Sequence, residues 1–240
     1  MGLQFAGRWF GRCPASTLES ICLAVDTNGC PVYIDWCERH LLTIGESDSG
    51  KGSVLANLLV QVEPFAQAGL VRLYGIDLKA MELSMSRAMF QTVAIDVESA
   101  AELVSSFRNA MNQRARDMAG SARMHTPTPD NPRNILVIDE LAELFRQDAK
   151  VSKQFQHDLT AVLGMGRATG NLVWGFSQNP RKEAIPIRYA HGRVGGKDDA
   201  PLSRTPSWRR PLGHLRRFAG NRLVVELRRK EIPTVSRGLD

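Results

Sequence analysis

Gly45-Glu46-Ser47-Asp48-Ser49-Gly50-Lys51-Gly52-Ser53 is the most informative segment of this chain, because it connects an apolar run at 40–44 to a segment with helical apolar spacing. A strand, a glycine-rich turn and a helix form the context that a phosphate-binding loop requires. The turn directs backbone N–H groups toward a polyphosphate, and the helix N-terminus adds partial positive charge. Lys51 would contact the β- and γ-phosphates. Residues 45–53 are therefore predicted to bind a nucleotide; the alternative is a glycine-rich connection with an exposed lysine.

One position departs from the usual pattern of such loops. The residue after the lysine is normally a Ser or Thr whose hydroxyl holds Mg²⁺, but here it is Gly52, and Ser53 follows one place later. The sequence leaves open whether Ser53 or a water molecule takes the magnesium position.

A second motif is the continuous apolar run at 134–138, which is β-branched enough for a strand buried on both faces and ends in Asp139-Glu140. Two carboxylates at the end of a buried strand are costly unless they meet a cation or a donor. We expect Asp139 to hold Mg²⁺ and Glu140 to activate the attacking water. Alternatively, the two acids begin the next helix, where they suit the positive end of its dipole.

A third apolar strand, within residues 170–180, delivers Ser177 and Gln178 to its carboxyl end. Ligands bind at this edge of an open parallel sheet. Gln178 would sense a γ-phosphate or orient the water; the alternative is a strand-end residue that satisfies loop backbone.

The remaining pattern predicts further elements of an α/β domain. We expect a hairpin at 21–35, with Asn28-Gly29 in its turn, and a strand at 70–76 that delivers Asp77 and Lys79 to its end. These two residues would support the nucleotide site or pair with each other. Helical spacing covers the segment from the loop to Gln67, residues 97–119 and residues 152–165, and the loop at 119–133 is expected to be exposed.

Residues 40–183 resemble the motor domain of the FtsK/SpoIIIE family of DNA translocases, especially its actinobacterial plasmid-transfer branch. The resemblance rests on six motifs in the family's order: 40–45, 50–53, Gly75-Ile-Asp77-Leu-Lys79-Ala-Met-Glu82-Leu83, 137–142, Gly166-Arg167-Ala-Thr-Gly170, and Ser177-Gln178-Asn-Pro180-Arg-Lys-Glu183. Asp77-Leu-Lys79 departs mildly from the family's usual Asp-Pro-Lys.

The resemblance implies a RecA-like P-loop NTPase fold, with a mainly parallel sheet flanked by helices. It also implies ATP and Mg²⁺ as cofactors, and ATP hydrolysis coupled to movement of double-stranded DNA by a homo-oligomeric ring, a hexamer in this family, with a membrane-bound partner. Arg167 would contact a neighbouring subunit's γ-phosphate; alternatively it complements a helix dipole. The rival functions are a small-molecule kinase and a truncated remnant that binds ATP and DNA without moving DNA.

We expect an N-terminal segment with a β-hairpin (1–39), a P-loop ATPase core (40–186) and a basic Arg-rich tail (187–240), which its charge sets apart. The net charge is +6, yet the tail holds thirteen Lys or Arg against five Asp or Glu. Such a tail fits a DNA-binding arm. The interpretation we favour is a shifted reading frame, which yields Arg, Gly and Pro without a burial pattern and predicts an incomplete sheet with exposed strand edges.

Composition excludes several classes of protein. No apolar run approaches the ~18–20 residues of a membrane span, and the first residues lack the pattern of a secretory signal. The four cysteines show no close pair, so we expect neither a zinc site nor a disulfide. The chain is therefore expected to be cytoplasmic, with any membrane association supplied by a partner.

Overall fold

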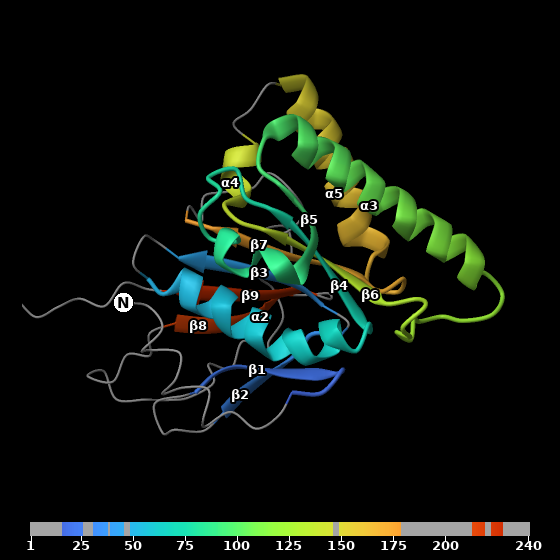
Figure 1. The fold of residues 1–240 in the computed structure, drawn as a ribbon, viewed down its shortest axis with the longest axis horizontal. Helices are drawn as coiled ribbons and strands as arrows, with labels where there is room; N and C mark the ends of the chain where they lie inside the picture. Colours follow the sequence, from blue (N-terminus) through green and yellow to red (C-terminus); the bar gives the residue numbers. More distant parts are fainter. Residues whose placement is uncertain are drawn as a thin grey trace, which may run out of the picture.

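The computed structural model describes residues 16–25, 31–37, 39–45, 49–145, 149–178, 213–218 and 222–227. The elements in chain order are β1 (Ser20–Val25), β2 (Pro31–Asp35), β3 (His40–Gly45), α2 (Lys51–Gln67), β4 (Val71–Ile76), the 3₁₀ helix η1 (Ser84–Met89), β5 (Phe90–Ala94), α3 (Val97–Met118), β6 (Arg133–Ile138), α4 (Leu141–Leu144), α5 (Ala149–Met165), β7 (Asn171–Ser177), β8 (Gly213–Phe218) and β9 (Arg222–Leu227). Figure 1 shows them as a sheet between layers of helices.

The main sheet has seven strands among the described residues, in the order β5-β4-β6-β7-β3-β9-β8. Every neighbouring pair from β5 to β9 is parallel, and only β8 runs antiparallel to β9. The predicted α/β fold with a mainly parallel sheet is confirmed. Because β7 separates β3 from β6, the two strands that precede the predicted site motifs are not adjacent.

Both faces of the sheet are covered, which explains why its central strands are continuously apolar. In β6, Ile135 and Val137 pack into the core beneath α2 and the hairpin, whereas Leu136 and Ile138 pack into the core beneath α3, α4 and α5. Side chains alternate between the two faces of a strand. A strand covered on both faces therefore needs apolar residues at every position.

The predicted helices form with small differences in their bounds. Helix α2 ends at Gln67 as expected, and Gly69, with φ 73°, follows it. On α3 the face toward the core is made by Ala100, Val104, Phe107 and Met111. Ala101 is half-buried and Ala110 is exposed, so neither belongs to this face. Asp96 is the N-cap of this helix and forms a capping box with Ser99.

The predicted hairpin is confirmed as a separate antiparallel sheet of β1 and β2. Its Asn28-Gly29 turn lies outside the described residues. Arg133, at the start of β6, holds this unit to the core: its guanidinium lies 5.0 Å from the Trp36 ring centroid and donates to the Leu18 carbonyl oxygen. From α2, Asn57 donates to the Leu23 carbonyl oxygen.

The basic tail contributes two strands to the main sheet, which corrects the expectation of an incomplete sheet. Residues 40–45 of β3 pair with 222–227 of β9 along their whole length, and β8 covers the outer edge of β9. The run at 222–227 was the one part of the tail with apolar clustering, and pairing with β3 explains that clustering. A shifted reading frame itself stays a prediction.

The expectation that no cysteine forms a disulfide is wrong for Cys22, which is disulfide-bonded. Its partner lies outside the described residues. Separation along the chain was the basis of the expectation, and it does not report proximity in space. None of the helices in the described ranges is both long and apolar enough to cross a membrane.

Candidate nucleotide-binding site

Three strands deliver the predicted site residues to one edge of the sheet. The strands β6, β7 and β3 are neighbours and parallel, so their carboxyl ends meet there (Figure 1). Asp139 and Glu140 follow β6, Gln178 follows β7, and the loop to Lys51 follows β3. The structure therefore brings together groups that are far apart in the sequence, at the edge where open α/β sheets bind ligands.

The described part of the predicted phosphate loop is Ser49 to Ser53; Gly45 ends β3, while Glu46, Ser47 and Asp48 lie outside the described residues. Gly50 has φ 94°, a left-handed conformation that glycine adopts without strain, and it precedes the first residue of α2. Among the described residues no side chain caps this helix end, and its first turn holds no acid. The backbone N–H groups are thus left to an anion.

Ser49 adds a second observation that fits a phosphate. Its Oγ is buried and has no hydrogen-bond partner among the described residues. A buried hydroxyl without a partner is unfavourable by about 1–3 kcal/mol. A phosphate oxygen would accept a hydrogen bond from this hydroxyl and remove that cost, so the residues present fit a nucleotide.

Lys51 lies against both predicted catalytic acids. Its Nζ is 3.8 Å from Asp139 Oδ1 and 3.5 Å from Glu140 Oε2, and all three side chains are largely buried. Lys51 is the first residue of α2, whereas the acids follow β6, so the contact spans the intervening β7. The loop lysine and the strand-end acids therefore lie side by side.

Glu140 is held in an unusual backbone conformation, with φ 53° and ψ 66°. A non-glycine residue in the left-handed region is strained by about 1–2 kcal/mol. The carboxylate accepts a hydrogen bond from Ser177 Oγ at 3.2 Å and from the Gln178 backbone N–H at 3.2 Å. These donors fix the orientation of the carboxylate. Helix α4 begins directly after Glu140, whose side chain forms no capping hydrogen bond with it.

Asp139 is buried in excess negative charge. The pKa of its carboxyl is raised to about 6, mainly by burial; Asp77, Glu82 and Glu140 contribute to the rise, and Lys51 opposes it. No group of three or more His, Cys, Asp or Glu in the described ranges could hold a metal ion by itself. Mg²⁺ usually binds proteins through one or two carboxylates together with phosphates and water. The residues present therefore fit a magnesium–nucleotide complex.

Several residues near Gly52 bear on the predicted magnesium position. Ser53, one of the two groups predicted for the magnesium position, is exposed. A Cβ at Gly52 would lie 3.1 Å from Glu82 Oε2. Asp77 is buried and accepts hydrogen bonds from the backbone N–H of Lys79 and Leu83, at 3.2 and 3.0 Å. Glu82 was quoted in a motif without a role, and no local spacing indicates that it reaches Gly52.

Arg167 is the one predicted catalytic residue that the structure places elsewhere. It lies in the turn between α5 and β7, before Asn171, and hence at the amino end of β7. The site lies at the carboxyl end of β7, about 20 Å away at ~3.3 Å per residue. Arg167 therefore does not join the site of its own chain.

A mainly parallel sheet, a glycine-rich loop that opens α2 and two acids after β6 define the class: this is a P-loop ATPase fold. Residues 16–131, just under half of the chain, match the model of the FtsK/SpoIIIE family. The predicted resemblance is confirmed there. The match begins before the expected core at residue 40 and ends before Asp139, so it includes the loop and Asp77 but not the acids of β6.

Solved structures share the fold. The pCW3 conjugation coupling protein TcpA, in its monomer form with ATPγS, is 22% identical with a TM-score of 0.58, covering 70% of this chain and 51% of TcpA. The cytoplasmic domain of the Thermomonospora curvata type VII secretion ATPase EccC is 20% identical with a TM-score of 0.55, covering 72% of this chain and 23% of its own. The chain thus spans about half of TcpA and less of EccC. A search of curated proteins finds no match.

Proposed function

We propose that this chain is the ATP-hydrolysing motor domain of a double-stranded DNA translocase, with Mg²⁺–ATP as its fuel. The observation that carries the proposal is the contact of Lys51 with Asp139 and Glu140, beside a helix N-terminus that no described side chain caps. This is the set of groups that phosphoryl-transfer sites use: a lysine for phosphates, an acid for the metal and an acid for the water.

Each residue has a separate task in the proposed reaction. Lys51 exchanges its carboxylate partners for phosphate oxygens when ATP binds. Asp139 would hold Mg²⁺, which neutralises phosphate charge when bound. Glu140 takes the proton of the attacking water, and Ser177 and Gln178 keep its carboxylate in place.

The role proposed for Arg167 requires a second copy of the chain. Because Arg167 lies at the amino end of β7, opposite the site of its own chain, a role at a γ-phosphate requires another copy, as in a ring.

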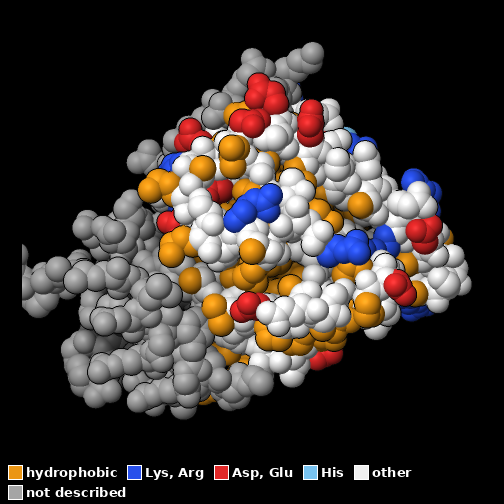
Figure 2. Space-filling model, in the orientation of Figure 1, with side chains coloured by type: hydrophobic (Ala, Val, Ile, Leu, Met, Phe, Trp, Pro, Cys, Tyr) orange, Lys and Arg blue, Asp and Glu red, His pale blue; other side chains and the backbone are white. Residues whose placement is uncertain are grey.

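Contact with DNA requires a basic surface. On the face drawn in Figure 2, basic and acidic side chains are interspersed. Contact with DNA therefore depends on a local patch or on the Arg-rich tail, which carries the charge excess.

The decisive experiment measures the steady-state ATPase rate of the full chain with and without long duplex DNA. We expect DNA to raise the ATPase rate at low salt. The increase should fall steeply as salt rises, because protein binding releases counterions from DNA and this release is less favourable at high salt. Lys51→Ala provides the background rate. An ATPase rate that ignores DNA at low salt would contradict translocation and favour the remnant or kinase alternative.

A further inference from the structure

We propose that the Glu82 carboxylate takes the place of the missing Ser or Thr hydroxyl at Gly52 and binds Mg²⁺ there; the inference rests on the proposed function. The first argument for this proposal is the position of Glu82 beside Gly52. At Gly52 the loop has no side chain, and Glu82 Oε2 lies 3.1 Å from the point where a Cβ would be. A carboxylate oxygen from another part of the chain thus occupies the space from which the usual hydroxyl would project.

The segment that carries Glu82 is held in place on both sides. Asp77, at the end of β4, accepts hydrogen bonds from the backbone N–H of Lys79 and Leu83, so its buried carboxylate folds residues 77–83 into a turn. Leu83 is fully buried and packs over Gly75, where a Cβ would lie only 2.7 Å from Leu83 Cδ1. Gly75 therefore allows Leu83 to dock, and Leu83 places its neighbour Glu82 beside α2.

Charge also favours a cation at this position. Glu82 and Asp139 are close enough for their negative charges to oppose each other, and Lys51 is paired with Asp139 and Glu140 rather than with Glu82. Glu82 is exposed, and none of the ion pairs among the described residues includes it. Oxygen ligands with negative charge suit Mg²⁺. Asp77 acts as a positioning residue, since its carboxylate is occupied by backbone donors.

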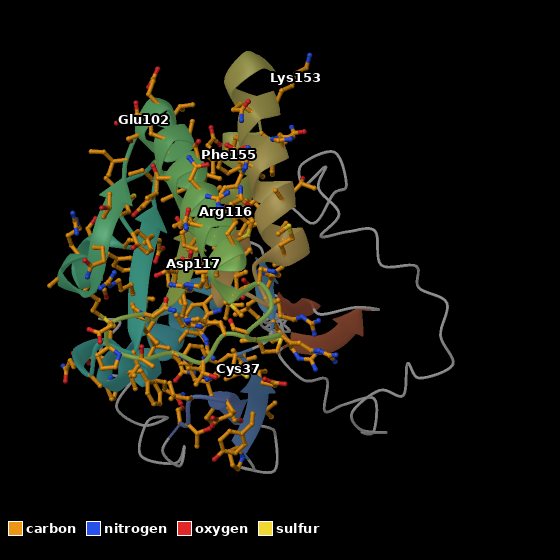
Figure 3. The ribbon with its side chains drawn as sticks, turned by 90° about the vertical axis from the view of Figure 1, so that its right-hand side faces the viewer. Cys37, Glu102, Arg116, Asp117, Lys153 and Phe155 are labelled. Carbon is orange, nitrogen blue, oxygen red and sulfur yellow. The ribbon has the colours of Figure 1, made fainter. Side chains whose placement is uncertain are left out.

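The test measures how strongly Mg²⁺ tightens the binding of a non-hydrolysable ATP analogue, as the ratio of Kd in EDTA to Kd in Mg²⁺. Glu82→Gln should lower this ratio by about 10–100-fold while leaving Kd in EDTA unchanged or tighter, because one metal ligand and one negative charge are removed. The matched control is Glu102→Gln on α3 (Figure 3), an exposed acid that should leave the ratio unchanged. Mn²⁺ bound with the analogue, followed by electron paramagnetic resonance, gives a second readout.

Restoring the hydroxyl tests the exchange of one group for the other. In the double variant Glu82→Ala with Gly52→Ser, the serine has room and should recover most of the Mg²⁺ effect. An unchanged ratio in Glu82→Gln, or a ratio that stays low in the double variant, overturns the proposal. Failure of the proposed function would look different: wild type and Lys51→Ala would bind the analogue equally weakly even in EDTA.

Discussion

Asp139→Asn should stabilise the nucleotide-free protein at neutral pH while removing the carboxylate that we propose as a ligand of Mg²⁺. In the folded chain, burial and the negative charges of Asp77, Glu82 and Glu140 raise the pKa of Asp139 from 3.8 to about 6, against the attraction of Lys51. The folded state therefore holds a proton that the unfolded chain has released at intermediate pH. Stability from this group is present below about pH 4 and is lost as pH rises through about 6.

The magnitude follows from the two pKa values. At ~1.4 kcal/mol for each tenfold change in the proton equilibrium, a rise from 3.8 to about 6 corresponds to roughly 3 kcal/mol of lost stability. Because domains are stable by only about 5–15 kcal/mol, this loss is large. Asn has the size of Asp but no charge, so the variant should escape the loss.

The assay compares urea unfolding of wild type and Asp139→Asn at about pH 4.5 and about pH 8. Hydrogen bonds lower the pKa of Asp96, so its contribution is lost as pH falls, with the opposite sign. That contribution is the same in both proteins and cancels in their difference. The expected result is a stability difference that grows in favour of the variant by about 2–3 kcal/mol between the two pH values. Parallel pH curves would refute the reasoning.

Three further predictions use other contacts. Lys51→Ala should abolish ATP binding, measured by titration, because it removes the lysine that faces Asp139 and Glu140; near-normal affinity would contradict the phosphate-loop assignment. Glu140→Gln should still bind ATP but lose about 10²–10⁴ in turnover, since an amide cannot take the proton of water; wild-type turnover would place the base elsewhere. Gly166→Ala should destabilise the protein by more than about 3 kcal/mol, because its Cβ would meet the backbone carbonyl oxygens of Val162 and Asn171. The matched control Gly164→Ala, with open space around it, should be neutral or stabilising by up to ~1 kcal/mol in thermal unfolding.

The sequence predicted the parts of the fold that have strong periodicity or turn signals. Helix α2, helix α3 and the three strands that end at the site follow directly from apolar spacing. Strand β5 was not predicted: only Phe90 and Ala94 of its residues are buried, so alternation is weak, and it is recognised by pairing with β4. The apolar clustering at 222–227 is typical of a strand. Its partner β3 lies far away in the chain, so the local pattern could not predict the pairing.

The site divides in the same way. Lys51, Asp139 and Glu140 were predicted because each ends or begins an element with a clear signal, and parallel strands bring such ends together. Their pairing distances, the left-handed backbone of Glu140 and the donors from Ser177 and Gln178 depend on tertiary packing. The role inferred for Glu82 could not be predicted from the sequence. It depends on the close approach of Glu82 to Gly52, which lies in helix α2 and has no side chain.

The position of β3 in the sheet connects the tail to the candidate site. Strand β3 leads directly into the phosphate loop, and it is flanked by β7 on one side and by β9 on the other. Without β9, the backbone groups of β3 that now pair over 40–45 would form an open edge beside the nucleotide site, and open edges invite pairing with other chains. Deleting residues 187–240 would therefore remove sheet structure together with basic charge, and a loss of DNA binding in such a truncation would not identify its cause. Replacing tail arginines outside β8 and β9 with glutamine, for example Arg209 and Arg210, changes the charge and keeps the strand pairing. The contribution of the tail to DNA binding is consequently a question for substitution, whereas its contribution to the phosphate loop is a question for deletion.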